Sequence, residues 1–246
     1  MLVAAMFLDL LGGVACQAED VESERTQPAT STTTNVATIA ANPPTQPKQN
    51  GDWQQLFPDE QCWFDIKRKI VIVDGQICQR EALLEMFACP RDTKDHESIV
   101  SLNCRAATIH AYLLLVGAQT GSPVRFRPEY VPAHGTEIEI FVHWTDENGK
   151  SHQCPAQELI RHAKTGAAMK HSWVFAGSEF WKDEDGQEHY LAESGELICV
   201  SNFPTATLDI PVESSQDNEG LLYEPFTERI PPRATKVRLV LQPKTK

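Results

Sequence analysis

The stretch 69–104, KIVIVDGQICQREALLEMFACPRDTKDHESIVSLNC, decides the fold prediction. It begins with the β-branched apolar run 69–73, and the Asp74-Gly75 pair that follows is typical of a hairpin turn. Residues 76–89 continue as one or two strands, 90–97 form a charged loop, and the short apolar run at 98–102 indicates another strand. This pattern predicts a strand-loop-strand framework at the start of the folded region.

Two helices are expected after this framework in the sequence. In the segment 105–116 the apolar side chains recur at helical spacing, Gly117 provides a stop, and Asn103 is a candidate N-cap. The segment 156–164, AQELIRHAK, reads as a second, short helix that ends before Gly166.

The rest of the domain is strand-rich. Residues 136–144 alternate strictly, and Asn148-Gly149 fits a two-residue hairpin turn. The other expected strands cover 171–180, 189–192, 195–203, 206–210 and 236–241. No internal repeat is apparent. The predicted fold class is α+β: a strand-rich single domain of antiparallel hairpins with about two helices.

Composition limits the classes of partner. The chain has 246 residues, of which 41% are hydrophobic and 23% charged, so it is long enough for one large or two small domains. Its formal net charge of -12 is spread along the chain. Such a surface repels phosphate backbones and anionic lipids, so no nucleic-acid partner is expected, and a membrane is expected only through an N-terminal anchor.

Residues 1–18, MLVAAMFLDLLGGVACQA, are typical of an export segment. The run 2–11 is apolar apart from Asp9, and it is too short to cross a bilayer, which needs about 20 residues. Gly13-Val14-Ala15-Cys16 resembles a degenerate lipoprotein motif. Lipidation at Cys16 and plain cleavage near Ala15 or Ala18 are both open, and either places the chain in the periplasm or cell envelope.

Residues 19–60 are rich in Thr, Pro, Gln, Asn and Ala and show no sustained period. Such a segment buries too little apolar surface to offset its ordering entropy, so a disordered linker is expected. The globular domain is therefore predicted to cover residues 61–246.

Four blocks of the domain carry a family resemblance. CQREALLEMFACPRDTKDHESIVSL (78–102), LLLVGAQTGSPV (113–124), SWVFAGS (172–178) and LICVSNFP (197–204) resemble the bacterial YdjY domain family, and the resemblance covers about residues 62–212. It implies an exported or envelope protein without an established activity. A ferredoxin-like label sometimes attached to the family implies iron–sulfur binding. The cysteine spacing argues against that ligand, since no two cysteines are closer than Cys78 and Cys89. The cofactor stays unknown.

The domain holds six cysteines: Cys62, Cys78, Cys89, Cys104, Cys154 and Cys199. An oxidising compartment permits disulfides, and six cysteines allow 15 connectivities, among which the sequence does not choose. Cys78 and Cys89 can bridge only if the chain reverses between them. Buried free thiols are the alternative for cysteines in apolar runs.

His96-Glu97 is the candidate functional loop. A zinc-protease motif needs a second His four residues after the first, and position 100 is Val. A loop imidazole beside a carboxylate remains, suited to proton transfer or ligand contact near neutral pH. The alternative is that the pair only hydrogen-bonds its own loop.

The two hairpins suggest further candidates. A two-residue turn at Asn148-Gly149 would place His143, His152 and Cys154 on one face, a ligand set that suits zinc or copper, with a solvent-facing polar patch as the alternative. A turn at Asp185-Gly186 would pair Trp181 with Tyr190, as a stabilising contact or a binding platform. The nearby carboxylates do not match an EF-hand loop; they belong to Asp183, Asp185 and Glu188.

Motifs of known catalysts are absent. Ser178 is not in a G-x-S-x-G elbow, and no phosphate loop or dinucleotide fingerprint occurs. The sequence therefore favours a non-enzymatic exported binding or interaction domain on a flexible tether. The alternative is a metal-binding or redox-linked protein that uses its His, Cys and Glu side chains.

Overall fold

The computed structural model describes residues 52–214 and 220–244. Strand β2 (Ile70–Ile77) runs straight through Asp74-Gly75, so the hairpin turn predicted at that pair is wrong. One edge of β2 pairs with β16 (Lys236–Pro243), and its other edge is shared by β1 (Cys62–Asp65) and β4 (Ser98–Leu102). A Cβ at Gly75 would lie 2.4 Å from the carbonyl oxygen of Ser101. Glycine is used here because it lets β4 approach.

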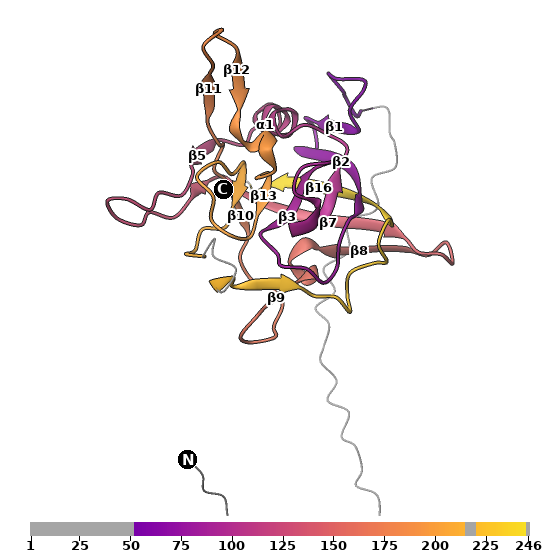
Figure 1. Cartoon of the computed structure of the whole chain (residues 1–246). Coiled ribbons are helices and arrows are strands. Elements are labelled where there is room, and N and C mark those ends of the chain that lie inside the picture. Colours follow the sequence, from indigo (N-terminus) through magenta and orange to yellow (C-terminus); the bar gives the residue numbers. More distant parts are fainter. Residues whose placement is uncertain (1–51, 215–219, 245–246) are drawn as a thin grey trace, which may run out of the picture. The chain divides into compact units, whose positions relative to one another are not determined.

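The remaining elements complete a strand-rich fold (Figure 1). The other strands are β3 (Met86–Pro90), β5 (Thr120–Ser122), β6 (His134–Gly135), β7 (Glu137–Thr145), β8 (Ser151–Pro155), β9 (Ile160–His162), β10 (Trp173–Phe175), β11 (Phe180–Lys182), β12 (Glu188–Tyr190), β13 (Ile198–Cys199), β14 (Leu208–Asp209) and β15 (Tyr223–Pro225). The helices are α1 (Ala106–Leu115) and the 3₁₀ turns η1 (Asp95–Glu97), η2 (Ala156–Leu159) and η3 (Leu191–Ser194).

Eight strands close into a barrel. The hydrogen-bonded order is β2-β16-β7-β10-β14-β13-β3-β4, and β4 returns to pair with β2. Neighbours are antiparallel except for two parallel pairs, β3 with β4 and β13 with β14. The predicted α+β class, a domain of antiparallel hairpins with about two helices, is therefore wrong: the described part of the chain is mostly β, a closed eight-stranded barrel with one α-helix. Most of the strand pairing joins segments that are distant in sequence, which local patterns do not predict. β16, near the end of the chain, lies between β2 and β7.

Only one α-helix occurs in the described part of the chain. The helix expected at 105–116 is α1, which buries Ile109, Tyr112 and Leu113. The expected helix at 156–164 is instead η2 followed by β9, because β9 pairs with β15. This distant pairing overrides the local helical pattern. Within the same described residues, no helix is long and apolar enough to cross a membrane.

The N-terminus of α1 is capped from a distance. Asn103 is not the N-cap, which is Arg105 and makes no side-chain cap bond. Both carboxylate oxygens of Glu193, in η3, instead accept the backbone N–H groups of Ala106 and Ala107, at 3.0 and 2.9 Å. A carboxylate at this end of a helix also interacts favourably with the helix dipole. The cap comes from a residue 87 positions away in the chain, so local sequence does not reveal it.

The ordered domain begins before the predicted boundary at residue 61. Gln54 forms an isolated bridge with Phe64, and the Trp53 and Trp63 rings lie 6.1 Å apart. Both tryptophans pack against an apolar cluster on the outside of the barrel, built on Ile72. At least residues 53 and 54 of the predicted linker therefore belong to the fold. The export segment 1–18, with Cys16, lies outside the described residues.

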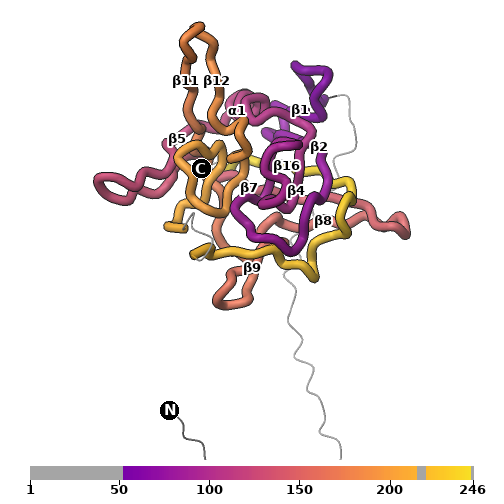
Figure 2. Tube along the Cα trace, in the orientation of Figure 1, coloured from indigo at the N-terminus to yellow at the C-terminus, as the bar shows by residue number. Residues whose placement is uncertain are grey.

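Trp173 is a central side chain of the core. It is completely buried on β10, its ring centroid lies 5.6 Å from that of Phe87, and its Nε1–H donates to the carbonyl of Cys199 at 2.8 Å. By contrast, Trp181 is 48% exposed on the β11–β12 hairpin, which projects from the barrel (Figures 1 and 2).

We expect Trp173→Phe to lower the free energy of unfolding by about 2–4 kcal/mol, because it leaves a cavity and an unpaired buried carbonyl. Trp181→Phe is the control and should change it by less than about 0.5 kcal/mol. Urea denaturation followed by circular dichroism measures both. Equal losses in the two variants would contradict the central role of Trp173.

Candidate functional site

The predicted loop residues His96 and Glu97 are separated by their environments. Both lie in η1, where the His96 side chain is 74% exposed and its Nε2 lies 3.4 Å from Glu97 Oε1. Glu97 is only 26% exposed and turns toward Lys94. The structure thus places His96 at the surface and Glu97 in a charge cluster that the sequence did not indicate.

Three carboxylates surround one ammonium group in this cluster, which we call the Lys94 cluster. Lys94 Nζ lies 3.1 Å from Glu196, 3.7 Å from Glu85 and 3.9 Å from Glu97. The ring of Phe203 covers the same ammonium group at 5.0 Å. Burial and the adjacent Glu97 carboxylate raise the pKa of Glu85 to about 7, while Lys94 opposes the shift. Because three acids share one cation, Glu85 still binds a proton for part of the time at pH 7.

The Asn148-Gly149 hairpin differs from the predicted register by one residue. The turn has three residues rather than two: Asp146 N–H donates to the Lys150 carbonyl, and Gly149 has a φ of 78°. His152 therefore pairs with Trp144, and Cys154 with Val142. Both residues share the face of β7 that packs on the core, whereas His143 lies on the other face. The predicted convergence of His143, His152 and Cys154 is wrong.

The second hairpin has the same form. Phe180, not Trp181, pairs with Tyr190, and Trp181 stacks on His189 with ring centroids 4.9 Å apart. The two turns share a nine-residue pattern, W-x-D-E-x-G-x-x-H, at 144–152 and 181–189. In each copy one Asp oxygen accepts turn N–H groups, and the other lies 2.7 Å from the His Nε2.

The repeated pattern explains the register error. An Asp that accepts a backbone N–H four residues on stabilises a longer loop, with glycine in the left-handed conformation at its end. This short repeat was present in the sequence and was missed. The carboxylates of Asp183, Asp185 and Glu188 do not form a metal cluster: within 52–214 and 220–244, no group of three or more His, Cys, Asp or Glu side chains could hold a metal ion.

All six domain cysteines are free thiols in this structure; five are buried, and Cys154 is partly exposed. β3 runs antiparallel to β2, so the chain does reverse between Cys78 and Cys89. Each of these thiols bonds elsewhere: Cys78 Sγ–H donates to the Ser98 carbonyl at 2.9 Å, and Cys89 to Asp95 at 3.3 Å. Burial raises the pKa of Cys78 to about 12 and of Cys89 to about 11. These thiols are therefore protonated and unreactive near neutral pH.

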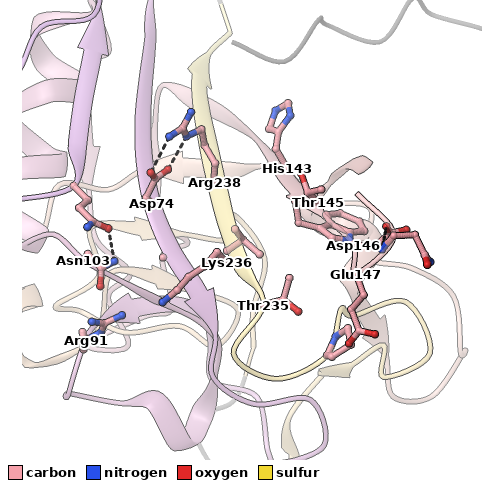
Figure 3. A pocket seen from close by; sticks show the side chains of 16 residues that line it. Asp74, Arg91, Asn103, His143, Thr145, Asp146, Glu147, Thr235, Lys236 and Arg238 are labelled. Atoms are coloured by element: carbon pink, nitrogen blue, oxygen red, sulfur yellow. Dashed lines mark hydrogen bonds and ion pairs between the residues drawn. The ribbon is translucent and has the colours of Figure 1, made fainter. Parts of the chain in front are cut away.

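A pocket of about 1010 Å³ lies on the outer side of the barrel wall, between β2, β16 and the β7–β8 turn (Figure 3). Alternation along the strands places polar side chains on this face. The residues that carry charge or hydrogen-bonding groups in it include Gln61, Asp74, Arg91, Asn103, His143, Glu147, Lys236 and Arg238. Sequence reasoning missed all of these except His143, because they come from segments that only barrel closure brings together.

The cations of the pocket are of two kinds. Arg238 is neutralised by Asp74, whose two oxygens accept its Nε and NH2 hydrogens at 2.6 and 2.8 Å (Figure 3). Lys236 Nζ donates only to Gln76, and in the described part of the chain neither Lys236 nor Arg91 has an acidic partner. In Figure 3 the Arg91 and Lys236 side chains extend into the same part of the pocket. The arrangement can accept an anion.

His143 is a buried polar group on the wall of the same pocket. Only 5% of it is exposed, and its Nδ1 has no hydrogen-bond partner within the described residues. Burial, and then the charge of Arg238, lower its pKa to about 4, so the ring is neutral at pH 7. An unpartnered buried polar atom has a desolvation cost that a ligand or an ordered water can relieve.

Comparisons with known proteins identify one family. A family model described as the YdjY domain matches residues 62–242, which extends beyond the resemblance at 62–212 as far as β16. Neither the comparison with curated proteins nor that with solved structures found a match.

Titration of Glu85 should make stability fall with rising pH. Its folded pKa of about 7 lies above the ordinary value of 4.5, so the folded state retains a proton that the unfolded state releases between these values. The free energy of unfolding should therefore decrease from pH 4.5 to 7, and Glu85→Gln should flatten that decrease. Denaturation midpoints at several pH values measure it. Glu184→Gln, on an exposed turn, should keep the wild-type slope; a shared slope in all three proteins would refute the assignment.

Proposed function

The chain belongs to the YdjY domain family, and we propose that it is an exported, tethered, non-enzymatic binding domain that holds a small anionic ligand in the pocket beside β2 and β16. The observation that carries the proposal is the presence of two cations without acidic partners in one pocket of a chain whose net charge is -12.

Export is supported by the sequence at the N-terminus. Residues 1–18 combine a short apolar run with small residues near Ala15 and Ala18, and a Thr- and Pro-rich segment follows. Together they describe a domain held at a distance from its export segment by a flexible tether, in the periplasm or cell envelope. An anchor at Cys16 would keep the domain at the membrane.

Ligand binding is supported by how the charges are distributed. The chain has 34 acidic and 22 basic residues, and three acids line this pocket: Asp74, Asp146 and Glu147. Asp74 pairs with Arg238 and Asp146 with His152, and no acid pairs with Arg91 or Lys236 in the described residues. Guanidinium and ammonium groups are the usual partners of carboxylate and phosphate oxygens. A small molecule that bears a carboxylate or a phosphate matches this set.

The alternative of a metal-binding protein has lost its geometric basis. That alternative, metal-binding or redox-linked, used either His96, Glu97 and the cysteines or the set His143, His152 and Cys154. β7 and β8 pair in a register that separates the second set. Within 52–214 and 220–244, no group of three or more His, Cys, Asp or Glu side chains could hold a metal ion.

We expect isothermal titration calorimetry to detect binding of citrate or inorganic phosphate, the two probe anions, with an affinity that falls as salt rises. The double variant Arg91→Ala/Lys236→Ala should weaken binding at least about tenfold, since each lost charge-assisted hydrogen bond is worth about 1.5–3 kcal/mol. The control Lys164→Ala/Lys170→Ala removes the same charge outside the pocket and should bind like the wild type. Equal affinities in all three proteins, or no heat with either probe, would count against the pocket.

Export has its own test. Cells that express the full chain should yield a protein in the envelope or periplasmic fraction that has lost its first 15–18 residues, as intact-mass measurement would show. A mass that corresponds to a diacylglyceryl group on Cys16 would identify the lipid-anchored form. Full-length chain in the cytosolic fraction, with residues 1–18 intact, would exclude export without affecting the pocket.

A further inference from the structure

The shared edge of β2 brings two cysteine-bearing segments together. At Asp74 this edge changes partner: Asp74 N–H donates to the Gln61 carbonyl at 2.9 Å, and Asn103 N–H donates to the Asp74 carbonyl at 3.0 Å. Gln61 N–H in turn donates to the Asn103 carbonyl at 2.9 Å. The chain entering β1 and the chain leaving β4 thus meet beside one residue of β2.

The directions of β1 and β4 bring Cys62 and Cys104 close to each other. β1 and β4 are both antiparallel to β2, so they run parallel to each other. One step beyond the paired Gln61 and Asn103 are Cys62 and Cys104. Both side chains belong to the same buried core cluster, and the Cys62 thiol is the main cause of the raised pKa of Cys104. Cys62 is completely buried and Cys104 is 7% exposed.

Glu60 completes the group. The Cys104 thiol donates to Glu60 Oε2 at 3.1 Å, and the same oxygen accepts the Arg105 backbone N–H at 3.1 Å. Glu60 Oε1 accepts the Arg105 Nε–H at 2.6 Å. The carboxylate therefore holds the start of α1 against β1, and with it the two thiols.

The surroundings of Cys104 favour a stable disulfide rather than a reactive thiol. Contact with Cys62, then burial and Glu60, raise the pKa of Cys104 far above its ordinary value of 9.0. A thiol that ionises with difficulty is a poor nucleophile and a poor metal ligand. It is also a poor leaving group, so the disulfide that it forms resists reduction.

Cys78 and Cys89 are another pair that influence each other, since Cys89 contributes, after burial, to the raised pKa of Cys78. Cys78 and Cys89 donate to oxygens of Ser98 and Asp95 rather than to each other. Cys199 is fully buried, and the charged groups that influence it are Asp209, Glu196, Lys94 and Glu85. Among the described thiols, the influence of Cys62 on Cys104 is the strongest that one cysteine has on another, so this pair is the favoured link; three of the 15 complete connectivities contain it.

We propose that Cys62 and Cys104 form a structural disulfide that links β1 to the start of α1. The oxidant is a disulfide compound of the glutathione type. Thiolate from one cysteine attacks it to form a mixed disulfide and release one thiol; the second cysteine then attacks the mixed disulfide and releases the other. Two S–H bonds break, one S–S bond forms, and the oxidant is reduced to two thiols. The two protons that leave the cysteines end on the two thiols of the reduced oxidant.

The link should stabilise the fold because it closes the segment that contains β2, β3 and β4. A cross-link over such a distance lowers the entropy of the unfolded chain, and a Tm increase of roughly 5–15 °C is expected for a domain of this size.

The test is a thiol map of the full chain. Protein purified reduced, and protein refolded from denaturant, are each incubated with oxidised glutathione, unfolded in acid and alkylated with N-ethylmaleimide. Two fewer alkylated thiols than in the reduced sample are expected, with one linked peptide pair that contains Cys62 and Cys104. Refolding gives the oxidant access to buried thiols, so slow reaction in the native state does not obscure the result.

Variants assign the link. Cys62→Ser and Cys104→Ser should each abolish the cross-link and the Tm increase, whereas Cys199→Ser, which removes a buried thiol elsewhere, should retain both. A full set of alkylated thiols after both treatments, a link that maps to another pair, or an unchanged Tm would each overturn the proposal. None of these outcomes bears on the anion titration, so the two proposals fail separately.

Discussion

Closure of the barrel depends on one tight contact between two backbones. β4 can pair with β2 because residue 75 has no side chain; a Cβ there would lie 2.4 Å from the Ser101 carbonyl oxygen and 2.9 Å from the Leu102 side chain. Without this pairing the sheet would have free edges at β2 and β4, and exposed edges invite association with other chains. One glycine in the middle of a strand thus allows an eight-stranded ring whose interior is filled by side chains such as Trp173.

The same junction organises both proposed sites. Asp74 lies at the point of β2 where the neighbouring strand changes from β1 to β4. Its backbone hydrogen-bonds to Gln61 and Asn103. Its side chain forms the bidentate ion pair with Arg238 on the pocket wall. The cysteines lie one residue beyond those two partners. The pocket and the thiol pair therefore both depend on the junction of β1 and β4 at Asp74, although they use different side chains.

Charge is distributed so that the acids neutralise some cations and not others. Lys94 is surrounded by three carboxylates and Arg238 by one, and both are partly buried. Arg91 and Lys236 stay exposed at the pocket, where water solvates them in the absence of a ligand. The overall charge of -12 therefore does not describe the electrostatic potential in the pocket. That potential depends on which nearby cations have acidic neighbours.

The sequence by itself determined the elements with strong local patterns. The 3.6-residue spacing at 105–116 predicted α1, the alternation at 136–144 predicted β7, and four quoted blocks indicated the family that the matching model confirms. These features depend on neighbouring residues alone. The hairpin registers were also encoded locally, in the W-x-D-E-x-G-x-x-H pattern, but the Asn-Gly and Asp-Gly pairs favoured a shorter turn than the Asp side chains stabilise.

Only the tertiary structure decided the fold class, the pocket and the thiol contact. β16 lies between β2 and β7, and Glu193 caps α1 from 87 residues away, and no local propensity encodes either pairing. His143 could be named from the sequence, but its face and its missing partner depend on register and burial. Cys62 and Cys104 meet because two strands share one edge of β2, a constraint that exists only once the sheet has closed.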